Sequence, residues 1–370
     1  MREMANPSEF QPQWACPPGT TIGRLLTSYE LLPIDFADKV GLSLSGATRL
    51  LNGSLDLSED LAVRLADVIG GSPRFWLERE KRYREHAARL ESEKPLAAEW
   101  LRSLPLSDMK RFGWLPGSTK RTELYSDCLD FFDVSSLSEW EARYSPVIDE
   151  TTFRNSTSIE SKRGSIASWL RRGEILAEEV ICQPWNSPKF LDTLRGLRKL
   201  TRTRNPETFL PQLREACSDC GVALVIAQGP RGCPASGATR FLTPRKALLL
   251  LSFRFLTDDH FWFSFFHEAG HLVLHGDKTI IEAKSEEPVA LRLEAEANRF
   301  AEEILIPSSG SPLSHVQVTK PAIREFARQL GIAPGIVVGQ MQYKGYLSHR
   351  NMNHLKTRYM WTPTILESES

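Results

Sequence analysis

Apolar residues recur every three to four positions through the first ninety residues, and polar residues, glycine or proline interrupt each periodic run. This spacing is typical of short amphipathic helices. Ser43 and Ser58 stand where an N-cap is expected, and Ser72 followed by Pro73 is a common helix start. The pattern therefore predicts five consecutive helices, in residues 17–31, 33–41, 43–53, 58–71 and 72–90.

Further along the chain the hydrophobic period changes. Residues 91–180 alternate charged helical segments with polar loops, which predicts a mostly helical connecting region. Residues 221–228 form a continuous apolar run typical of a buried strand, and residues 237–254 hold two strand-like runs around a proline turn. Helical patterns return at 257–276 and 291–307. The predicted fold class is α+β and mostly helical, with an all-α N-terminal part followed by an α+β part.

The composition is that of a globular protein: 41% of the 370 residues are apolar and 25% are charged. The 46 basic and 46 acidic residues cancel, so the total charge does not indicate a strongly basic nucleic-acid binder. Six scattered cysteines suit reduced thiols of the cytosol better than a disulfide framework. With no signal-peptide pattern and no run of about 20 apolar residues, we expect a cytoplasmic protein that does not enter a membrane.

The most informative stretch is FWFSFFHEAGHLVLHG, residues 261–276, because it holds two histidines four positions apart in an apolar segment. On a helix, His267 and His271 lie about 40° and ~6 Å apart, so both imidazoles can reach one zinc ion. Glu268 lies beside that point and can take a proton from a zinc-bound water. Two core histidines with ordinary hydrogen-bond partners are the alternative. The apolar context favours the metal, as does Gly270, which admits a close neighbour despite its cost in a helix.

A zinc site of this kind needs a third protein ligand. His275 continues the series, but it lies ~12 Å from His267 along a straight helix. It is therefore predicted to support a ligand from behind or to end the helix. An extended pattern with a third histidine is excluded, because Leu274 and Asp277 stand where that pattern needs glycine and histidine.

The segment 291–307 offers two carboxylates, Glu294 and Glu296, on opposite flanks of its apolar face. Helical periodicity alone slightly favours Glu294 as the third ligand, and a solvated helix surface is the alternative for either residue. Asn298, four residues after Glu294, is placed to support the site by a hydrogen bond to a ligand histidine.

The stretch FWFSFFHEAGHLVLHG, followed by EAEANRFAEEILIP, resembles the ImmA/IrrE family of zinc metallopeptidases. The likeness covers roughly residues 160 to 360. It implies a compact, zincin-like α+β domain and assigns the third-ligand glutamate of the family's E-x-x-A-N segment to Glu294. It also implies cleavage of a specific cytoplasmic repressor protein at one site. The expected centre is thus one zinc ion held by His267, His271 and Glu294.

Residues 33–53 have the spacing of a helix–turn–helix. Ala37 is small where two helices would cross, Gly41 would make the turn, and Ala47 and Leu50 would pack the second helix onto the first. The outward face of the second helix would enter a DNA major groove, where Arg49 suits guanine and Asn52 suits adenine or phosphate. A plain helical dimerisation bundle is the alternative, because the near-neutral charge attracts phosphate weakly. The candidate DNA contacts are Ser43, Ser45, Thr48, Arg49 and Asn52.

Residues 19–85 resemble the XRE/Cro-type regulators and, among these, the HigA-like antitoxins, through LSLSGATRLLNGSLDLSEDLAVRLADVIGGSPRFWLEREKRY. The resemblance implies operator DNA and a HigB-like toxin as partners, and we further expect a homodimer through this domain. The predicted domains are a helix–turn–helix domain at 19–90, the connecting region at 91–180 and a metallopeptidase domain at 181–362.

These features together predict a cytoplasmic DNA-binding regulator that carries a zinc endopeptidase domain, with Glu268 as its catalytic acid–base residue. Its expected substrate is a repressor-like or antitoxin-like protein. The alternative belongs to another class: a HigA-like transcriptional repressor or antitoxin whose zincin-like domain is not catalytic and only senses or binds a partner.

Overall fold

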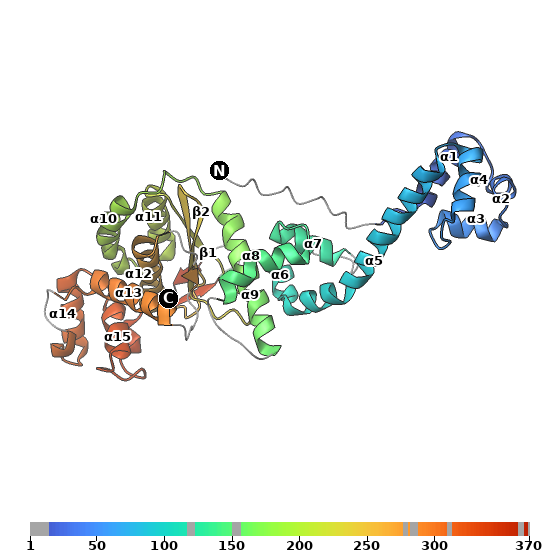
Figure 1. Cartoon of the computed structure of the whole chain (residues 1–370). Helices are drawn as coiled ribbons and strands as arrows, with labels where there is room; N and C mark the ends of the chain where they lie inside the picture. Colours follow the sequence, from blue (N-terminus) through green and yellow to red (C-terminus); the bar gives the residue numbers. More distant parts are fainter. Residues whose placement is uncertain are drawn as a thin grey trace. The chain divides into compact units, whose positions relative to one another are not determined.

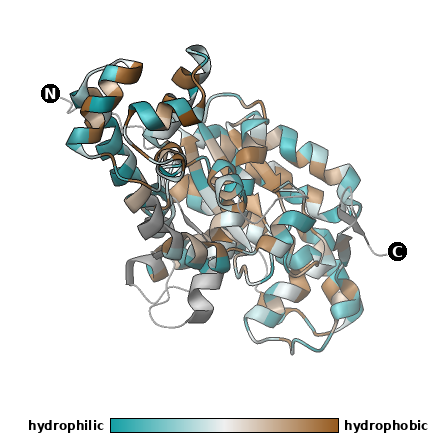
Figure 2. Cartoon of the chain, turned by 90° about the vertical axis from the view of Figure 1, so that its right-hand side faces the viewer, coloured by the Kyte–Doolittle hydropathy of each residue, from teal (hydrophilic) through white to brown (hydrophobic). Residues whose placement is uncertain are grey.

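The structure is a computed structural model that describes residues 15–116, 123–149, 157–276, 280–281, 288–308, 313–361 and 366–368. The chain divides into two compact units, Met1–Trp100 and Leu101–Ser370. Figure 1 labels the α-helices of both units and the strands β1 and β2. Figure 2 shows hydrophobic and hydrophilic residues alternating around the helices, as in amphipathic helices that cover a core.

The first unit is a helical bundle of α1 (Pro18–Ser28), α2 (Pro33–Lys39), α3 (Leu44–Leu51), α4 (Glu59–Ile69) and the first part of α5 (Pro73–Ser103). Three expected caps are confirmed: the hydroxyls of Ser43, Ser58 and Ser72 each accept a backbone hydrogen bond from the first helical turn. Burying a large apolar side chain stabilises a fold by roughly 1.5–3 kcal/mol. The buried core draws such side chains from every helix, including Ile22, Phe36, Leu50, Leu65 and Trp76.

A sharp turn joins α2 to α3. Gly41 has a φ of 66°, in the left-handed region that glycine adopts at little cost. The N–H of Leu42 then donates to the carbonyl oxygen of Ala37 at 2.8 Å, which closes the turn. Ala37 and Ala47 are fully buried, so the two helices approach closely, as the sequence predicted.

Helix α5 runs further than the sequence pattern indicated. The expected end lay near residue 90, whereas α5 continues to Ser103 and contains Pro95. A proline inside a helix removes one hydrogen bond and normally kinks or ends it. In the sequence, residues with high helix propensity flank Pro95 on both sides.

The second unit is built around a mixed sheet of β1 (Val222–Ile226), β2 (Gly237–Thr243), β3 (Lys246–Leu251) and β4 (Ile280–Ile281), in the order β1-β3-β2-β4. The strands predicted in 221–228 and 237–254 are confirmed. β1 is parallel to β3, whereas β2 is antiparallel to both β3 and β4. The described chain is thus mainly helical with a small sheet, which is the predicted α+β class.

Helices cover both faces of this sheet (Figure 1). On one face lie α11 (Pro206–Ser218) and α12 (Asp258–Leu274), with α10 (Ser187–Leu197) packed against them. On the other face lies α9 (Thr157–Glu178), where Gly173 packs against the side chain of Leu250. The strand register therefore places Gly237, Leu249 and Leu251 on the α12 face, and Arg240 and Leu250 on the α9 face.

Helix α9 is more buried than the charged helical segments predicted for residues 91–180 would be on a surface. Nearly every residue from Gly164 to Glu174 is buried, including Trp169 and Leu170. The reason is that α9 lies between the sheet and a second set of helices, α6 (Leu106–Arg111), α7 (Leu124–Phe132) and α8 (Leu137–Asp149). Helices α6, α7 and α8 therefore cover polar residues of α9, such as Ser168 and Glu174, that would otherwise face solvent.

Helices α13 (Pro288–Leu305), α14 (Lys320–Leu330) and α15 (Pro334–Tyr343) complete the unit. Short 3-10 helices lie between α10 and α11 (Arg198–Arg202), between α13 and α14 (Leu313–His315) and after α15 (Asn353–Leu355). β5 (Tyr359–Trp361) pairs with β6 (Leu366–Ser368). Helix α15 is packed on α12 and α14 and is largely buried. Among the described helices, none combines the length and apolar character that crossing a membrane requires.

The first turn of α12 carries two buried carboxylates, Asp258 and Asp259. The ammonium of Lys356 lies 2.6 Å from Asp259 Oδ2, with both side chains at most 10% exposed. The backbone of α15 approaches both acids through Gly335 and Gly339, where an added Cβ would overlap the carboxylates. These contacts fix the start of α12, and thereby the rotation of the whole helix.

Candidate metal centre

Helices α12 and α13 bring the three predicted ligands together. The Nε2 atoms of His267 and His271 lie 3.0 Å apart. Glu294 Oε2 is 3.1 Å from His267 Nε2, and Glu294 Oε1 is 3.4 Å from His271 Nε2. One donor atom from each residue lies within 4.8 Å of the other two. Two imidazole nitrogens and a carboxylate at this spacing suit a zinc ion.

Close packing of α12 on α13 creates this geometry. A Cβ added to Gly270 would come within 2.9 Å of the Phe300 ring, so only glycine allows α13 to approach at this point. Glu294 and Asn298 lie one turn apart on α13 and both face His267. Glycine at position 270 was expected to admit a close neighbour, and the structure identifies that neighbour as Phe300.

Both candidate ligand histidines are supported from behind. His267 Nδ1 lies 3.0 Å from Asn298 Oδ1, so an Nδ1–H group can donate to the amide oxygen. His271 Nδ1 lies 2.9 Å from His275 Nδ1, and His275 Nε2 lies 3.1 Å from Glu296 Oε2. Partners at Nδ1 leave the Nε2 lone pairs for a metal. The structure thus places Asn298 and His275 where the sequence expected supporting residues.

The protonation states also suit a cation. Burial tends to raise the pKa of Glu294, but the imidazoles of His267 and His271 outweigh it, and the pKa falls to about 2. Burial lowers the pKa of His271 below its usual value. Near neutral pH the cluster therefore offers an ionised carboxylate and a neutral imidazole, which are the forms that bind metal.

Glu268 lies on the sheet side of α12 and is completely buried. Its carboxylate lies against the backbone of β2 at Gly237, where an added Cβ would overlap it. Sequence reasoning did not single out Gly237, although a glycine in a strand often marks a close approach. This close approach restrains Glu268, which directly follows the candidate ligand His267 in α12.

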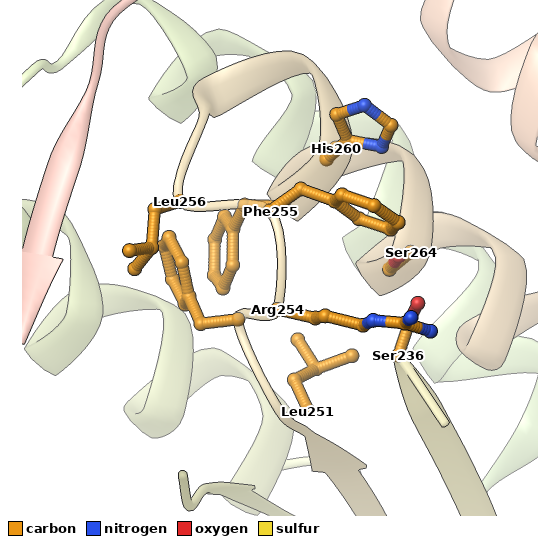
Figure 3. A pocket seen from close by; sticks show the side chains of 9 residues that line it. Ser236, Leu251, Arg254, Phe255, Leu256, His260 and Ser264 are labelled. Carbon is orange, nitrogen blue, oxygen red and sulfur yellow. The ribbon is translucent and has the colours of Figure 1, made fainter. Parts of the chain in front are cut away.

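Two hollows adjoin the N-terminal half of α12. One, of about 90 Å³, lies one turn before His267, between Phe263, Leu305, Ile336 and Tyr343. The Phe263 ring centre lies 6.1 Å from that of His267, so one residue that lines this hollow also lies near a candidate ligand. The other, shown in Figure 3, lies between Ser236, Arg254, His260 and Ser264 and encloses only about 10 Å³. That space is too small for a substrate group.

The five candidate DNA contacts are all exposed on or beside α3. Three of them use a polar atom locally: Ser43 caps the helix, the Thr48 hydroxyl donates to the Leu44 carbonyl, and Asn52 Oδ1 accepts from Ser54 N–H. These bonds would have to be shared or exchanged on DNA. Arg49 and Ser45 also lie on the outer surface, so Arg49 is the strongest candidate for a base contact.

Comparison with known proteins yields two partial matches. Residues 234–317 match the model of the family Peptidase_M78, described as the IrrE N-terminal-like domain. Over 60 residues the chain is 37% identical to the uncharacterized HTH-type transcriptional regulator YddM of Escherichia coli (strain K12). That match covers 16% of this chain, and the chain spans 64% of the length of that relative.

The peptidase match includes β2, β3, α12 and α13, and therefore His267, Glu268, His271, His275, Glu294 and Asn298. It supports the resemblance to the ImmA/IrrE family. The second match supports similarity to a transcriptional regulator of the helix–turn–helix type.

Proposed function

We propose that this protein is a cytoplasmic DNA-binding regulator with a zinc-dependent endopeptidase domain that cleaves one regulatory protein at a specific site. The observation that carries the proposal is the cluster of His267, His271 and Glu294 within 4.8 Å, beside the buried Glu268. Both comparisons are consistent with it, because one is to a peptidase family and the other to a transcriptional regulator.

In this proposal His267, His271 and Glu294 hold one zinc ion. Bound zinc supplies a Lewis acid that polarises a carbonyl and makes water more acidic. Glu268 takes a proton from the attacking water and later gives it to the leaving amine. Asn298 and His275 keep the two imidazoles in the orientation and tautomer that leave Nε2 for the metal.

The substrate we propose is a repressor-like or antitoxin-like protein, with operator DNA as a second partner through α3. The hollow beside Phe263 would receive an apolar side chain of the substrate near the cleaved bond. If the helix–turn–helix domain at 19–90 is HigA-like, a HigB-like toxin and a second copy of this chain are further partners. The helix–turn–helix geometry and the exposed Arg49 support the DNA role.

The test uses the purified full chain with zinc and repressor proteins encoded near it. Wild type should cut one of them at a single bond, whereas Glu268→Gln should reduce the rate by at least 100-fold, because no carboxylate remains to move the proton. Glu325→Gln, on the exposed surface of α14, is the matched control and should cut normally. Equal cleavage by wild type and Glu268→Gln would refute the enzymatic role.

The second candidate is a HigA-like repressor or antitoxin with a non-catalytic zincin-like domain, and the similarity to a named transcriptional regulator favours it. Comparing Arg49→Ala with Glu268→Gln in cells distinguishes the two candidate functions. A regulator without peptidase activity predicts that only Arg49→Ala changes expression of the target genes. The proposed function predicts that Glu268→Gln alone preserves the uncut substrate.

A further inference from the structure

A larger cavity lies on the α9 face of the sheet, opposite the candidate metal centre. It encloses about 370 Å³, within the range of roughly 300–1,000 Å³ that small-molecule sites occupy. Helices α8 and α9 and the β2–β3 hairpin form its walls. The polar residues that line it are Arg143, Arg171, Glu174, Glu178, Arg240, Thr243 and Lys246.

Cations outnumber anions in this lining by four to two, because Arg143, Arg171, Arg240 and Lys246 face Glu174 and Glu178. The side chain of Glu178 is 66% exposed, so its charge is largely solvated. The next acid, Asp133, lies 3.8 Å from Arg143 with 75% of its side chain exposed. The wall of the cavity therefore carries an excess of positive charge.

One buried carboxylate serves three guanidinium groups. Glu174, 3% exposed, lies 2.5 Å from Arg240 Nη1, 3.3 Å from Arg143 Nη2 and 3.4 Å from Arg171 Nη1. Arg171 and Arg143 also donate to the backbone carbonyls of Phe131, Phe132 and Asp133, but these neutral acceptors balance none of the positive charge. The side chain of Arg171 is only 9% exposed, so water compensates little of its charge. An anion that joined these buried and partly buried cations would reduce the cost of their surplus charge.

We propose that this cavity binds a small molecule that carries a phosphate group. A phosphate dianion would balance the two surplus charges, and arginine guanidinium groups match its oxygens in a forked geometry. The volume leaves room for an organic part beside Leu242 and Thr243.

The position of Arg240 links this site to the candidate catalytic carboxylate. Arg240 is three residues from Gly237 on β2, and the two face opposite sides of the sheet. Gly237 lies against Glu268. A ligand held by Arg240 would therefore restrain the strand that positions Glu268.

The test is isothermal titration of the full chain with inorganic phosphate and, separately, with a nucleoside monophosphate, at constant ionic strength set with chloride. Wild type should bind one equivalent. Arg240→Gln should bind about 10- to 100-fold more weakly, the usual loss for one hydrogen bond to a charged group. Arg245→Gln, an exposed arginine in the same hairpin but outside the cavity lining, should bind like wild type.

Tighter binding of the monophosphate would indicate an organic phosphate as the ligand, and equal binding would indicate phosphate itself. Absence of saturable binding to wild type, or unchanged binding by Arg240→Gln, would overturn the proposal. If Arg240→Gln does not fold, phosphate binding by Thr243→Asp tests the site instead. It adds a negative charge at the rim while keeping an acceptor for Arg245 N–H, so it should weaken binding at least tenfold. Unchanged binding by that variant would likewise refute the site.

Discussion

The imidazoles of His271 and His275 share a hydrogen bond of 2.9 Å between their Nδ1 atoms. One nitrogen must donate and the other must accept. When His271 uses Nε2 as a ligand atom, its Nδ1–H donates to His275, whose Nε2–H then points to Glu296 at 3.1 Å. Glu296 thus orients the His275 ring, and His275 in turn orients the candidate ligand His271.

We therefore expect His275→Ala to keep the three ligands but to lower zinc affinity by about 10- to 100-fold. Competition with a chromophoric chelator measures the change. His315→Ala, in the 3-10 turn Leu313–His315, is the control and should match wild type. An unchanged affinity for His275→Ala would mean that His271 needs no support from this side.

Glu294 and Glu296 are two residues apart, and the structure gives them different roles. Glu294 lies 3.1 Å from His267 Nε2, whereas Glu296 contacts His275 and Arg292. Elemental analysis after dialysis should find one zinc per wild-type chain, far less in Glu294→Ala, and close to one in Glu296→Ala. If Glu296→Ala lost its zinc and Glu294→Ala kept it, Glu296 would be the ligand instead. One zinc per chain in both variants would show that Glu294 is not a ligand.

Gly237→Ala should disturb the centre from the sheet side. The added Cβ would overlap the Glu268 carboxylate, and such overpacking costs about 1–3 kcal/mol of unfolding free energy. Gly196→Ala on α10 is the matched control, because its Cβ would meet open space and should be neutral or stabilising. Urea unfolding of the full-length variants compares them. Equal free energies of unfolding for Gly237→Ala and Gly196→Ala would show that β2 can shift to accommodate the added Cβ.

Asp258 makes the stability of the second unit depend on pH. Burial, with a further contribution from Asp259, raises the pKa of Asp258 to about 7. A raised carboxyl pKa means that the protonated form stabilises the fold. That stability is fully present below the unfolded pKa of about 3.9 and is lost as pH rises through about 7. The loss amounts to no more than about 4 kcal/mol.

Between pH 5 and pH 8 the free energy of unfolding should therefore fall less in Asp258→Asn than in wild type. The amide stays neutral, and its oxygen can still accept from Asp259 N–H. Asp192→Asn, at an exposed position on α10, should follow the wild-type curve. Parallel curves for wild type and Asp258→Asn would show that Asp258 is ionised in the folded protein throughout this range.

Local features of this protein could be predicted well from its sequence. The caps at Ser43 and Ser58 depend on a few adjacent residues, and so does the turn at Gly41. The approach of His267 to His271 follows from helical geometry alone. Periodicity only slightly favoured Glu294, because its position depends on how α13 packs against α12.

Contacts between distant segments were not predictable in the same way. The overlap that excludes a side chain at Gly237 involves a residue thirty-one positions later, and Lys356 meets Asp259 across almost one hundred positions. Neither pair has a pattern in the sequence. The cavity around Glu174 was also missed, because its arginines come from α8, α9 and β2 and share no motif.

The family match at 234–317 is narrower than the structure that supports the histidine helix. Strand β1 pairs with β3 from outside that range, and Gly335, Gly339 and Lys356 position the first turn of α12 from beyond it. A fragment trimmed to the matched range would lose the central strand's parallel neighbour and the counter-charge of Asp259. A version of the second unit expressed alone should accordingly start near residue 101 and keep the residues that follow 317.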